Sequence, residues 1–143
     1  MLNVAITING QRPIGARAKL VPTNSSPIVT FVLKSEHEKD DKIYELNTLT
    51  QFTDYNQPQR PCALLKTCCI FTGIIDVNST EDMTLSEQLK KNLFGYSLTL
   101  EAWSNVPVGS GLGTSSILAG AILLALWKLI GNENGRDSML IRT

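Results

Sequence analysis

The stretch that most constrains this chain is a glycine-rich loop at residues 107–116, PVGSGLGTSS, which runs directly into an apolar segment at 117–127. Its three glycines alternate with other residues, so the backbone can adopt positive φ and an anion can approach peptide N–H groups without meeting a Cβ. Three consecutive hydroxyl residues follow where a helix would begin. Thr114 or Ser115 can cap that helix while the positive end of its dipole faces the same anion. The stretch therefore predicts a phosphate-binding loop in a nucleotide site.

Two other phosphate loops are excluded by single residues. A Walker loop needs a lysine beside its last Ser or Thr, and Gly113 is followed by Thr114 without one. A dinucleotide G-x-G-x-x-G loop needs a third glycine, but that place holds Thr114 or Ser116, depending on where the count begins. The alternative is a glycine-rich turn before a core helix. The run of three hydroxyls favours the binding interpretation, since such residues gather before a helix to cap it, to bind an ion, or both.

The pattern P-x-G-x-G-L-G-T-S-S resembles the second signature motif of the GHMP small-molecule kinases, whose members phosphorylate galactose, homoserine, mevalonate and phosphomevalonate. Within that family the sequence of residues 109–120 is most similar to that of the L-fucose kinase (fucokinase) branch. The resemblance covers nearly the whole chain. Further stretches agree with that branch in the same order: residues 9–17, 54–58, 63–66 and 85–89.

The resemblance implies an ATP-dependent sugar kinase that uses ATP and Mg²⁺ and phosphorylates L-fucose at its anomeric hydroxyl, in fucose salvage. In the family this loop wraps the triphosphate, and a serine of the motif reaches Mg²⁺. By motif position that serine is Ser115, with Thr114 and Ser116 assisting. The expected nucleotide-binding residues are Gly109, Ser110, Gly111, Leu112, Gly113, Thr114, Ser115 and Ser116.

Other motifs of the L-fucose kinase branch have no counterpart here, including the sugar-binding motif, the acid groups for Mg²⁺ and the sugar hydroxyl, and a third glycine-rich motif. No matched motif nominates Asp54, Asp76 or Glu101 as the catalytic base. Residues 1–143 are therefore expected to be the ATP-binding N-terminal half of a kinase domain, truncated at both ends and inactive without the missing remainder. Two alternatives stay open: a non-catalytic ATP-binding or structural fragment, and a GHMP kinase for another hexose.

The charge balance and the cysteine content indicate which classes of partner and which cellular environment to expect. Thirteen basic residues balance thirteen acidic ones, so no field of one sign points to nucleic acid. The three cysteines, two of them adjacent, suit neither a disulfide framework nor zinc spacing, which indicates a reducing, cytoplasmic environment. The apolar segment after residue 117 is interrupted by Lys128 and is shorter than the roughly 20 residues of a membrane span. We expect no membrane or nucleic-acid partner.

The periodicity predicts an α+β fold. Strands are expected at 2–8, 12–21, 27–33, 42–46 and 96–103, forming an antiparallel sheet with one exposed face. Helices are expected at 63–71, ended by Gly73, and from the capping box Thr84–Glu87 to Gly95. These helices would pack on one face beside the helix at 117. The resemblance implies the same arrangement, the N-terminal half of the GHMP kinase fold with a strand, glycine loop and helix at the phosphate site.

Two features near the expected site have a structural alternative. Trp103 ends the strand before the loop and could border an adenine pocket, but a partly buried structural tryptophan is the favoured interpretation. Arg12, Arg17 and Lys19 could form a basic site, although a solvated strand face is favoured for them.

Overall fold

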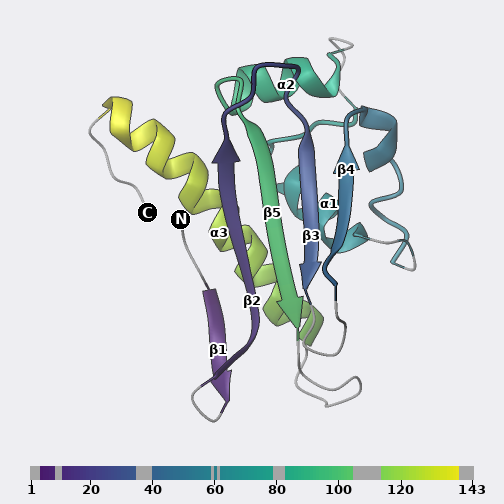
Figure 1. The fold of residues 1–143 in the computed structure, drawn as a ribbon, viewed down its shortest axis with the longest axis vertical. Coiled ribbons are helices and arrows are strands. Elements are labelled where there is room, and N and C mark those ends of the chain that lie inside the picture. Colours follow the sequence, from purple (N-terminus) through teal and green to yellow (C-terminus); the bar gives the residue numbers. More distant parts are fainter. Residues whose placement is uncertain are drawn as a thin grey trace.

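The computed structural model describes residues 4–8, 11–34, 40–58, 60, 62–78, 83–104 and 114–138. The elements are arranged as a sheet with helices packed against it (Figure 1). In chain order they are β1 (Val4–Ile8), β2 (Gln11–Val21), β3 (Val29–Lys34), β4 (Lys42–Leu46), η1 (Leu49–Phe52), α1 (Ala63–Phe71), α2 (Leu85–Asn92), β5 (Ser97–Ser104) and α3 (Thr114–Ser138).

The five strands form one sheet in the order β1-β2-β5-β3-β4. The β1–β2, β2–β5 and β3–β4 pairs are antiparallel, as predicted, but β3 and β5 run parallel. The expectation of a wholly antiparallel sheet is wrong at this one pair. Between β4 and β5 the chain passes through α1 and α2 and inserts β5 beside β3, and a helical crossover of this kind can return a strand parallel to its neighbour. The alternation of polar and apolar residues along a strand does not indicate which distant strand will pair with it.

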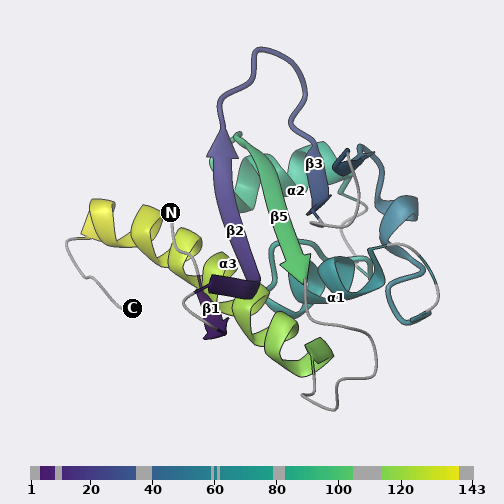
Figure 2. The ribbon, with the colours of Figure 1, turned by 60° about the horizontal axis from the view of Figure 1, so that its bottom comes forward.

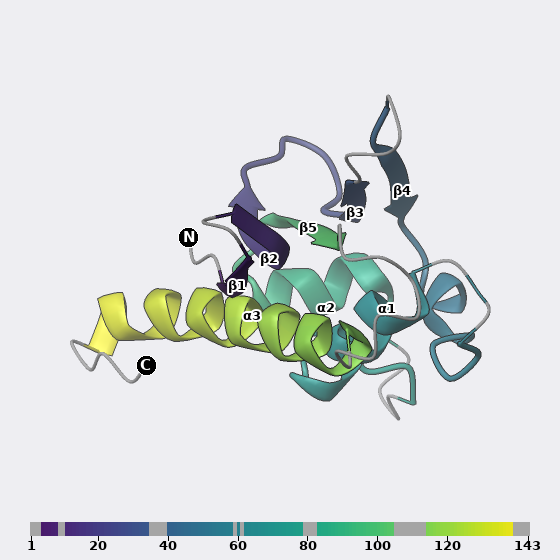
Figure 3. The ribbon, with the colours of Figure 1, turned by 90° about the horizontal axis from the view of Figure 1, so that it is seen from below.

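The helices cover one face of the sheet, as the view along the sheet shows (Figure 3). On β5 the apolar side chains of Leu98, Leu100 and Ala102 are buried, whereas the other face carries Thr99 and Trp103, which are partly exposed, and the buried polar residues Ser97 and Glu101. This alternation is what a sheet with one covered face requires. The predicted α+β fold, with helices packed on one face of the sheet and the other face open, is confirmed.

The core lies between the sheet and the helices. Phe31 of β3 and Phe52 of η1 are fully buried, and their rings meet edge to face with centroids 6.2 Å apart. From α3 the core receives Ala121, Ile122, Ala125 and Leu126, a stripe along one side of the helix. On the opposite side of α3, Gly120, Leu124 and Trp127 are exposed.

Local signals set the helix ends. The Thr84 hydroxyl accepts a hydrogen bond from the Glu87 N–H at 3.2 Å, and the Glu87 carboxylate accepts one from the Thr84 N–H at 3.2 Å, which confirms the capping box. Gly73 and Gly95 follow α1 and α2 with φ of 86° and 87°. Positive φ suits Gly73, the residue that follows the C-cap of α1. In α2 the residue that follows the C-cap Leu93 is Phe94, with φ of 57°, so the left-handed turn begins one residue before the predicted stop at Gly95.

Candidate functional site

The predicted phosphate loop is held between the central strand of the sheet and the longest helix. β5 ends at Ser104 and α3 begins at Thr114. Of the predicted site residues, 109–113 lie outside the described residues. Thr114, Ser115 and Ser116 form the first turn of α3, and their side chains also lie outside the described part. The structure therefore shows the two elements that flank the loop, and the roles of the loop residues stay predictions.

Both flanking elements are firmly anchored. β5 pairs with β2 from Ser97 to Ser104 and with β3 from Leu98 to Trp103. α3 crosses behind the sheet and passes α1 (Figure 2), where the Cys68 Sγ lies 4.0 Å from the Ala119 carbonyl oxygen. Ile122 and Leu126 are fully buried. A site supported by a central strand and a packed helix keeps its geometry when a ligand binds.

The start of α3 has the chemistry of an anion site. The first four N–H groups of an α-helix have no intrahelical acceptor, and the aligned peptide dipoles place a partial positive charge at the same end. α3 is 25 residues long and starts directly after the glycines of the loop. Its N-terminal N–H groups therefore belong to the segment that the sequence predicts to bind phosphate.

A charged cluster crosses three strands on the open face of the sheet. Glu101 of β5 is 8% exposed, and its Oε2 lies 3.0 Å from the Lys34 Nζ on β3 and 3.9 Å from the Arg17 guanidinium on β2. The two cations neutralise a carboxylate that is otherwise shielded from water. The favoured interpretation of Arg17 as a solvated strand residue is incomplete, because its partner is Glu101.

Trp103 packs over a glycine at the end of β5 nearest the loop. A Cβ added at Gly15 would lie 2.5 Å from the Trp103 Cζ2, so the ring covers the β2 backbone at a distance that only glycine allows. The Arg17 guanidinium carbon lies 5.9 Å from the ring centroid. These contacts support the structural role favoured for Trp103, and an adenine contact stays a prediction.

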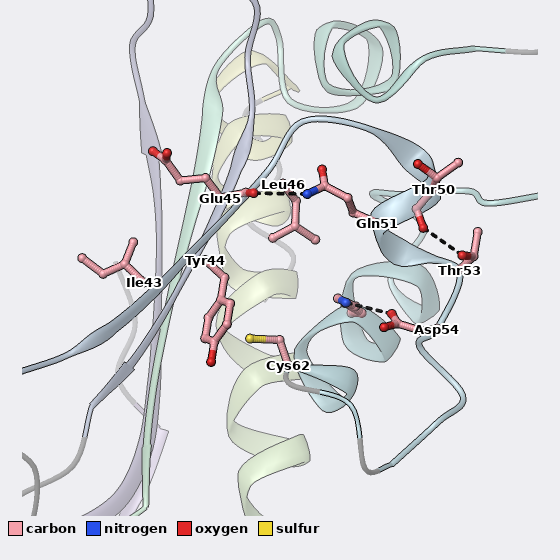
Figure 4. A pocket seen from close by; sticks show the side chains of 10 residues that line it. Ile43, Tyr44, Glu45, Leu46, Thr50, Gln51, Thr53, Asp54 and Cys62 are labelled. Carbon is pink, nitrogen blue, oxygen red and sulfur yellow. Dashed lines mark hydrogen bonds and ion pairs between the residues drawn. The ribbon is translucent and has the colours of Figure 1, made fainter.

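A cavity of about 540 Å³ opens between β4, η1 and α1 (Figure 4). Tyr44 and Cys62 point toward one another across it, while Ile43 and Glu45 extend from the opposite side of β4. The Lys66 ammonium donates a 2.7 Å hydrogen bond to the Asp54 carboxylate. The residues that line the cavity are Ile43, Tyr44, Glu45, Leu46, Thr50, Gln51, Thr53, Asp54, Cys62 and Lys66.

The Lys66–Asp54 ion pair is expected to make the free energy of unfolding depend on pH. The hydrogen bond from Lys66 holds the pKa of Asp54 below its ordinary value of 3.8. A lowered native pKa means that the pair stabilises the fold above the unfolded-state pKa and that this contribution disappears as the pH falls through the native pKa. We expect Asp54→Asn to lose about 1–2 kcal/mol of unfolding free energy at pH 7 and almost nothing at pH 2. Urea titrations at the two pH values measure the difference, and an equal loss at both would contradict the ion pair.

The other titratable groups near these elements are poor catalysts as placed. Burial raises the pKa of the Cys62 and Cys68 thiols to about 11 and raises that of Cys69 further, so all three stay protonated at neutral pH. The carboxylates of Asp54 and Glu101 are paired with cations. Across the described ranges no group of His, Cys, Asp and Glu side chains is placed to hold a metal ion. The described residues also lack a helix with the length and apolarity of a membrane span.

Sequence reasoning missed the pairings that cross elements. Asp54 and Lys66 appeared in two separate stretches that resemble fucose kinases, but no periodicity links a turn residue to a helix residue twelve positions later. Glu101 was considered only as a carboxylate without a motif. Because successive residues of β5 point to opposite faces of the sheet, Glu101 lies on the open face. A carboxylate at such a position could have suggested a cationic residue on a neighbouring strand.

Comparison with known proteins agrees with the motif analysis. The N-terminal domain model of the GHMP kinases matches residues 82–142, which include α2, β5, the glycine loop and α3. The chain is 30% identical over 139 residues to the bifunctional fucokinase/GDP-fucose pyrophosphorylase of Arabidopsis thaliana, an alignment of 97% of this chain and 11% of that protein. It is 31% identical over 144 residues to the L-fucokinase/L-fucose-1-P guanylyltransferase of Bacteroides fragilis, covering 100% of this chain and 14% of that protein.

The chain therefore spans about an eighth of the length of these relatives. The resemblance stated from the motifs is confirmed: the chain is similar along its length to one segment of fucokinase proteins, and the part that carries the glycine loop matches the N-terminal domain of the GHMP kinases.

Proposed function

We propose that the chain is the nucleotide-binding part of an ATP-dependent sugar kinase that phosphorylates L-fucose at the anomeric hydroxyl to fucose 1-phosphate. One observation carries the proposal: the GHMP kinase match covers the β5, loop and α3 unit, which has the order and anchoring of a phosphate site. The sugar is assigned from the two relatives, which are named as fucokinases. The activity belongs in the cytoplasm, where the three free cysteines stay reduced.

The loop residues have separate roles in this proposal. The N–H groups of residues 109–116 bind the triphosphate oxygens, and the Ser115 hydroxyl binds Mg²⁺, with Thr114 and Ser116 assisting. Bound Mg²⁺ neutralises charge on the phosphates. The N–H groups at the start of α3 stabilise the charge that develops on the transferred phosphoryl group, which is where most phosphoryl-transfer catalysis arises.

The catalytic base is proposed to lie outside this chain. In the transfer, the sugar oxygen attacks the γ-phosphorus, the bond to ADP breaks, and the proton of the sugar hydroxyl passes to a base. Asp54 and Glu101 form ion pairs with lysines, and an Asp76 carboxylate oxygen accepts a hydrogen bond from the Asn78 N–H. Residues 1–143 then form a partial kinase domain that binds nucleotide and needs the remainder for turnover.

The pairing of these acids also favours a second candidate, a non-catalytic ATP-binding fragment. The two candidates differ in whether turnover appears once the remainder of a kinase is supplied. Phosphorylation of L-fucose, assayed beside D-galactose and D-mannose, separates a fucose kinase from a kinase for another hexose. The absence of turnover with every sugar would favour the fragment.

Replacing Ser115 with alanine is expected to weaken Mg-ATP binding roughly tenfold or more, because a hydrogen bond or metal ligand to a charged group is lost. Isothermal titration of the chain with Mg-ATP measures the change. The matched control is Ser86→Ala, which removes the hydroxyl of a partly exposed residue of α2, outside the loop. This variant should bind Mg-ATP as the wild type does. Equal affinities for wild type and Ser115→Ala would refute the assigned role of Ser115.

A further inference from the structure

The outer side of the helix layer exposes several large apolar side chains close together. Phe71 at the end of α1 is 69% exposed and Trp127 of α3 is 46% exposed, and their rings meet edge to face with centroids 6.0 Å apart. Leu124, one turn before Trp127, and Phe94, just after α2, are also exposed. We name these four side chains the helix-layer patch. Gathered exposed apolar groups of this kind mark surfaces that contact another protein.

A cavity of about 360 Å³ lies beside the patch and is lined by one of its members, Phe94. It lies between the end of α1 at Thr72–Ile74, the end of α2 at Lys91 and Phe94, and Ile130 of α3. Ile130 is three residues after Trp127, so the two side chains are neighbours on the helix surface. The cavity thus lies next to the patch, with Phe94 on one side of it and Ile130, the helical neighbour of Trp127, on another.

The backbone at Phe94 is unusual for a large residue. Its φ is 57°, in the left-handed region, which a bulky side chain seldom adopts because its Cβ crowds the backbone. This conformation accompanies a ring that is 51% exposed and borders the cavity. Phe94 follows Leu93, the C-cap of α2, where a left-handed residue ends many helices, so this backbone holds the ring at the rim of the cavity.

Among the described residues, two lysines lie beside the patch. Lys91 lines the cavity, and Lys128 follows Trp127 and lies one turn after Leu124. Neither lysine forms an ion pair with another described residue. In a symmetric contact between two copies the same patch meets itself, which would bring these lysines together. The charge thus favours a different, acidic partner over a second copy of the chain.

We propose that the helix-layer patch is the docking surface for a protein segment with apolar side chains flanked by Asp and Glu. Its source rests on the proposed function: it belongs to the remainder of a fucokinase-like kinase, since this chain covers 11% and 14% of the relatives. Trp127 and Phe71 form the apolar centre of the contact, and Lys91 and Lys128 pair with the acids at its edge. Buried aromatic groups dominate such contacts.

The experiment is co-expression of this chain with a tagged Bacteroides fragilis relative from which the matched segment has been deleted. Co-purification is expected, and it should weaken as salt is raised because the lysines contribute. Trp127→Ser and the double variant Lys91→Glu/Lys128→Glu should each reduce the co-purified amount about tenfold or more. Ile43→Ser, which changes a residue that is 63% exposed on β4 on the other side of the sheet, is the matched control and should have no effect.

Three outcomes overturn the proposal: no co-purification, co-purification that both patch variants leave unchanged, or self-association of the chain that Trp127→Ser abolishes. Mg-ATP binding by the chain alone separates this test from the proposed function. The patch variants should bind Mg-ATP as wild type does. Failure of the wild-type chain to bind Mg-ATP would refute the nucleotide site without bearing on the patch.

Discussion

Replacing Phe31 with alanine is expected to reduce the free energy of unfolding by about 3–5 kcal/mol. Phe31 is fully buried on β3, between β5 and β4, and its ring contacts that of Phe52 edge to face at 6.2 Å. The substitution removes a large apolar group and leaves a cavity that the sheet cannot close. A domain of this size is stable by about 5–15 kcal/mol, so the variant loses a large share of its stability. Urea denaturation followed by circular dichroism measures the loss.

The matched control for this prediction is Phe71→Ala. It deletes the same side chain from a position that is 69% exposed, where the ring contacts Trp127. We expect a loss of about 1 kcal/mol or less, because little buried area disappears and only one aromatic contact is broken. Similar losses for the two variants would show that Phe31 is not in the core described above.

Gln88→Ala should have the second largest effect, through the loss of two partly buried hydrogen bonds. The Gln88 side chain is almost fully buried, its amide oxygen accepts a 2.7 Å hydrogen bond from the Asp76 N–H, and its NH₂ donates at 2.8 Å to the Asp76 carbonyl. It thus pairs with the backbone between α1 and α2 as a neighbouring strand would. Because Asp76 is exposed, water can partly replace the amide, and each lost hydrogen bond costs about 0.5–1.5 kcal/mol. Denaturant unfolding gives the total.

Hydrogen exchange tests the mechanism of the Gln88 prediction. The Asp76 amide should exchange much faster in Gln88→Ala, whereas the amides of β5 should change only with global stability. Gln57→Ala removes an amide from an exposed turn and should alter neither stability nor Asp76 exchange. Unchanged exchange at Asp76 in Gln88→Ala would mean that these hydrogen bonds do not form.

Much of the local structure follows from signals within a few residues. The helix at 63–71 has the predicted bounds, because its apolar spacing and Gly73 define it without help from the rest of the chain. The start of α2 follows from the reciprocal hydrogen bonds of Thr84 and Glu87. Alternating polarity likewise placed β3, β4 and β5 within one or two residues at each end.

Contacts between distant segments could not be predicted in this way. The parallel β3–β5 pair depends on where the chain returns after two helices, and alternation is the same in either direction. The need for glycine at position 15 appears only once Trp103 of β5 lies opposite it. The Glu101 cluster likewise combines β2, β3 and β5, and no spacing in the sequence brings these three strands together.

For the candidate site, too, one part follows from the sequence and another appears only in the structure. The glycines and hydroxyls at 109–116 indicate the chemistry from sequence alone, since each residue type has a specific use in binding phosphate. The structure adds the supports at either end, β5 in the middle of the sheet and α3 packed behind it. The cavity beside Lys66 and Asp54 is a separate feature that no sequence motif predicted.

The most direct test of the central claim is an amide-resolved NMR titration of this chain with Mg-ATP. We predict saturable shifts for the amides of residues 109–116, absent or much weaker in Ser115→Ala, with smaller changes at the end of β5. The same titration with Mg²⁺ alone should leave the glycine amides nearly unchanged. Shifts confined to the cavity around Cys62 and Lys66, or no shifts at saturating nucleotide, would contradict the assignment of the glycine loop as the nucleotide site.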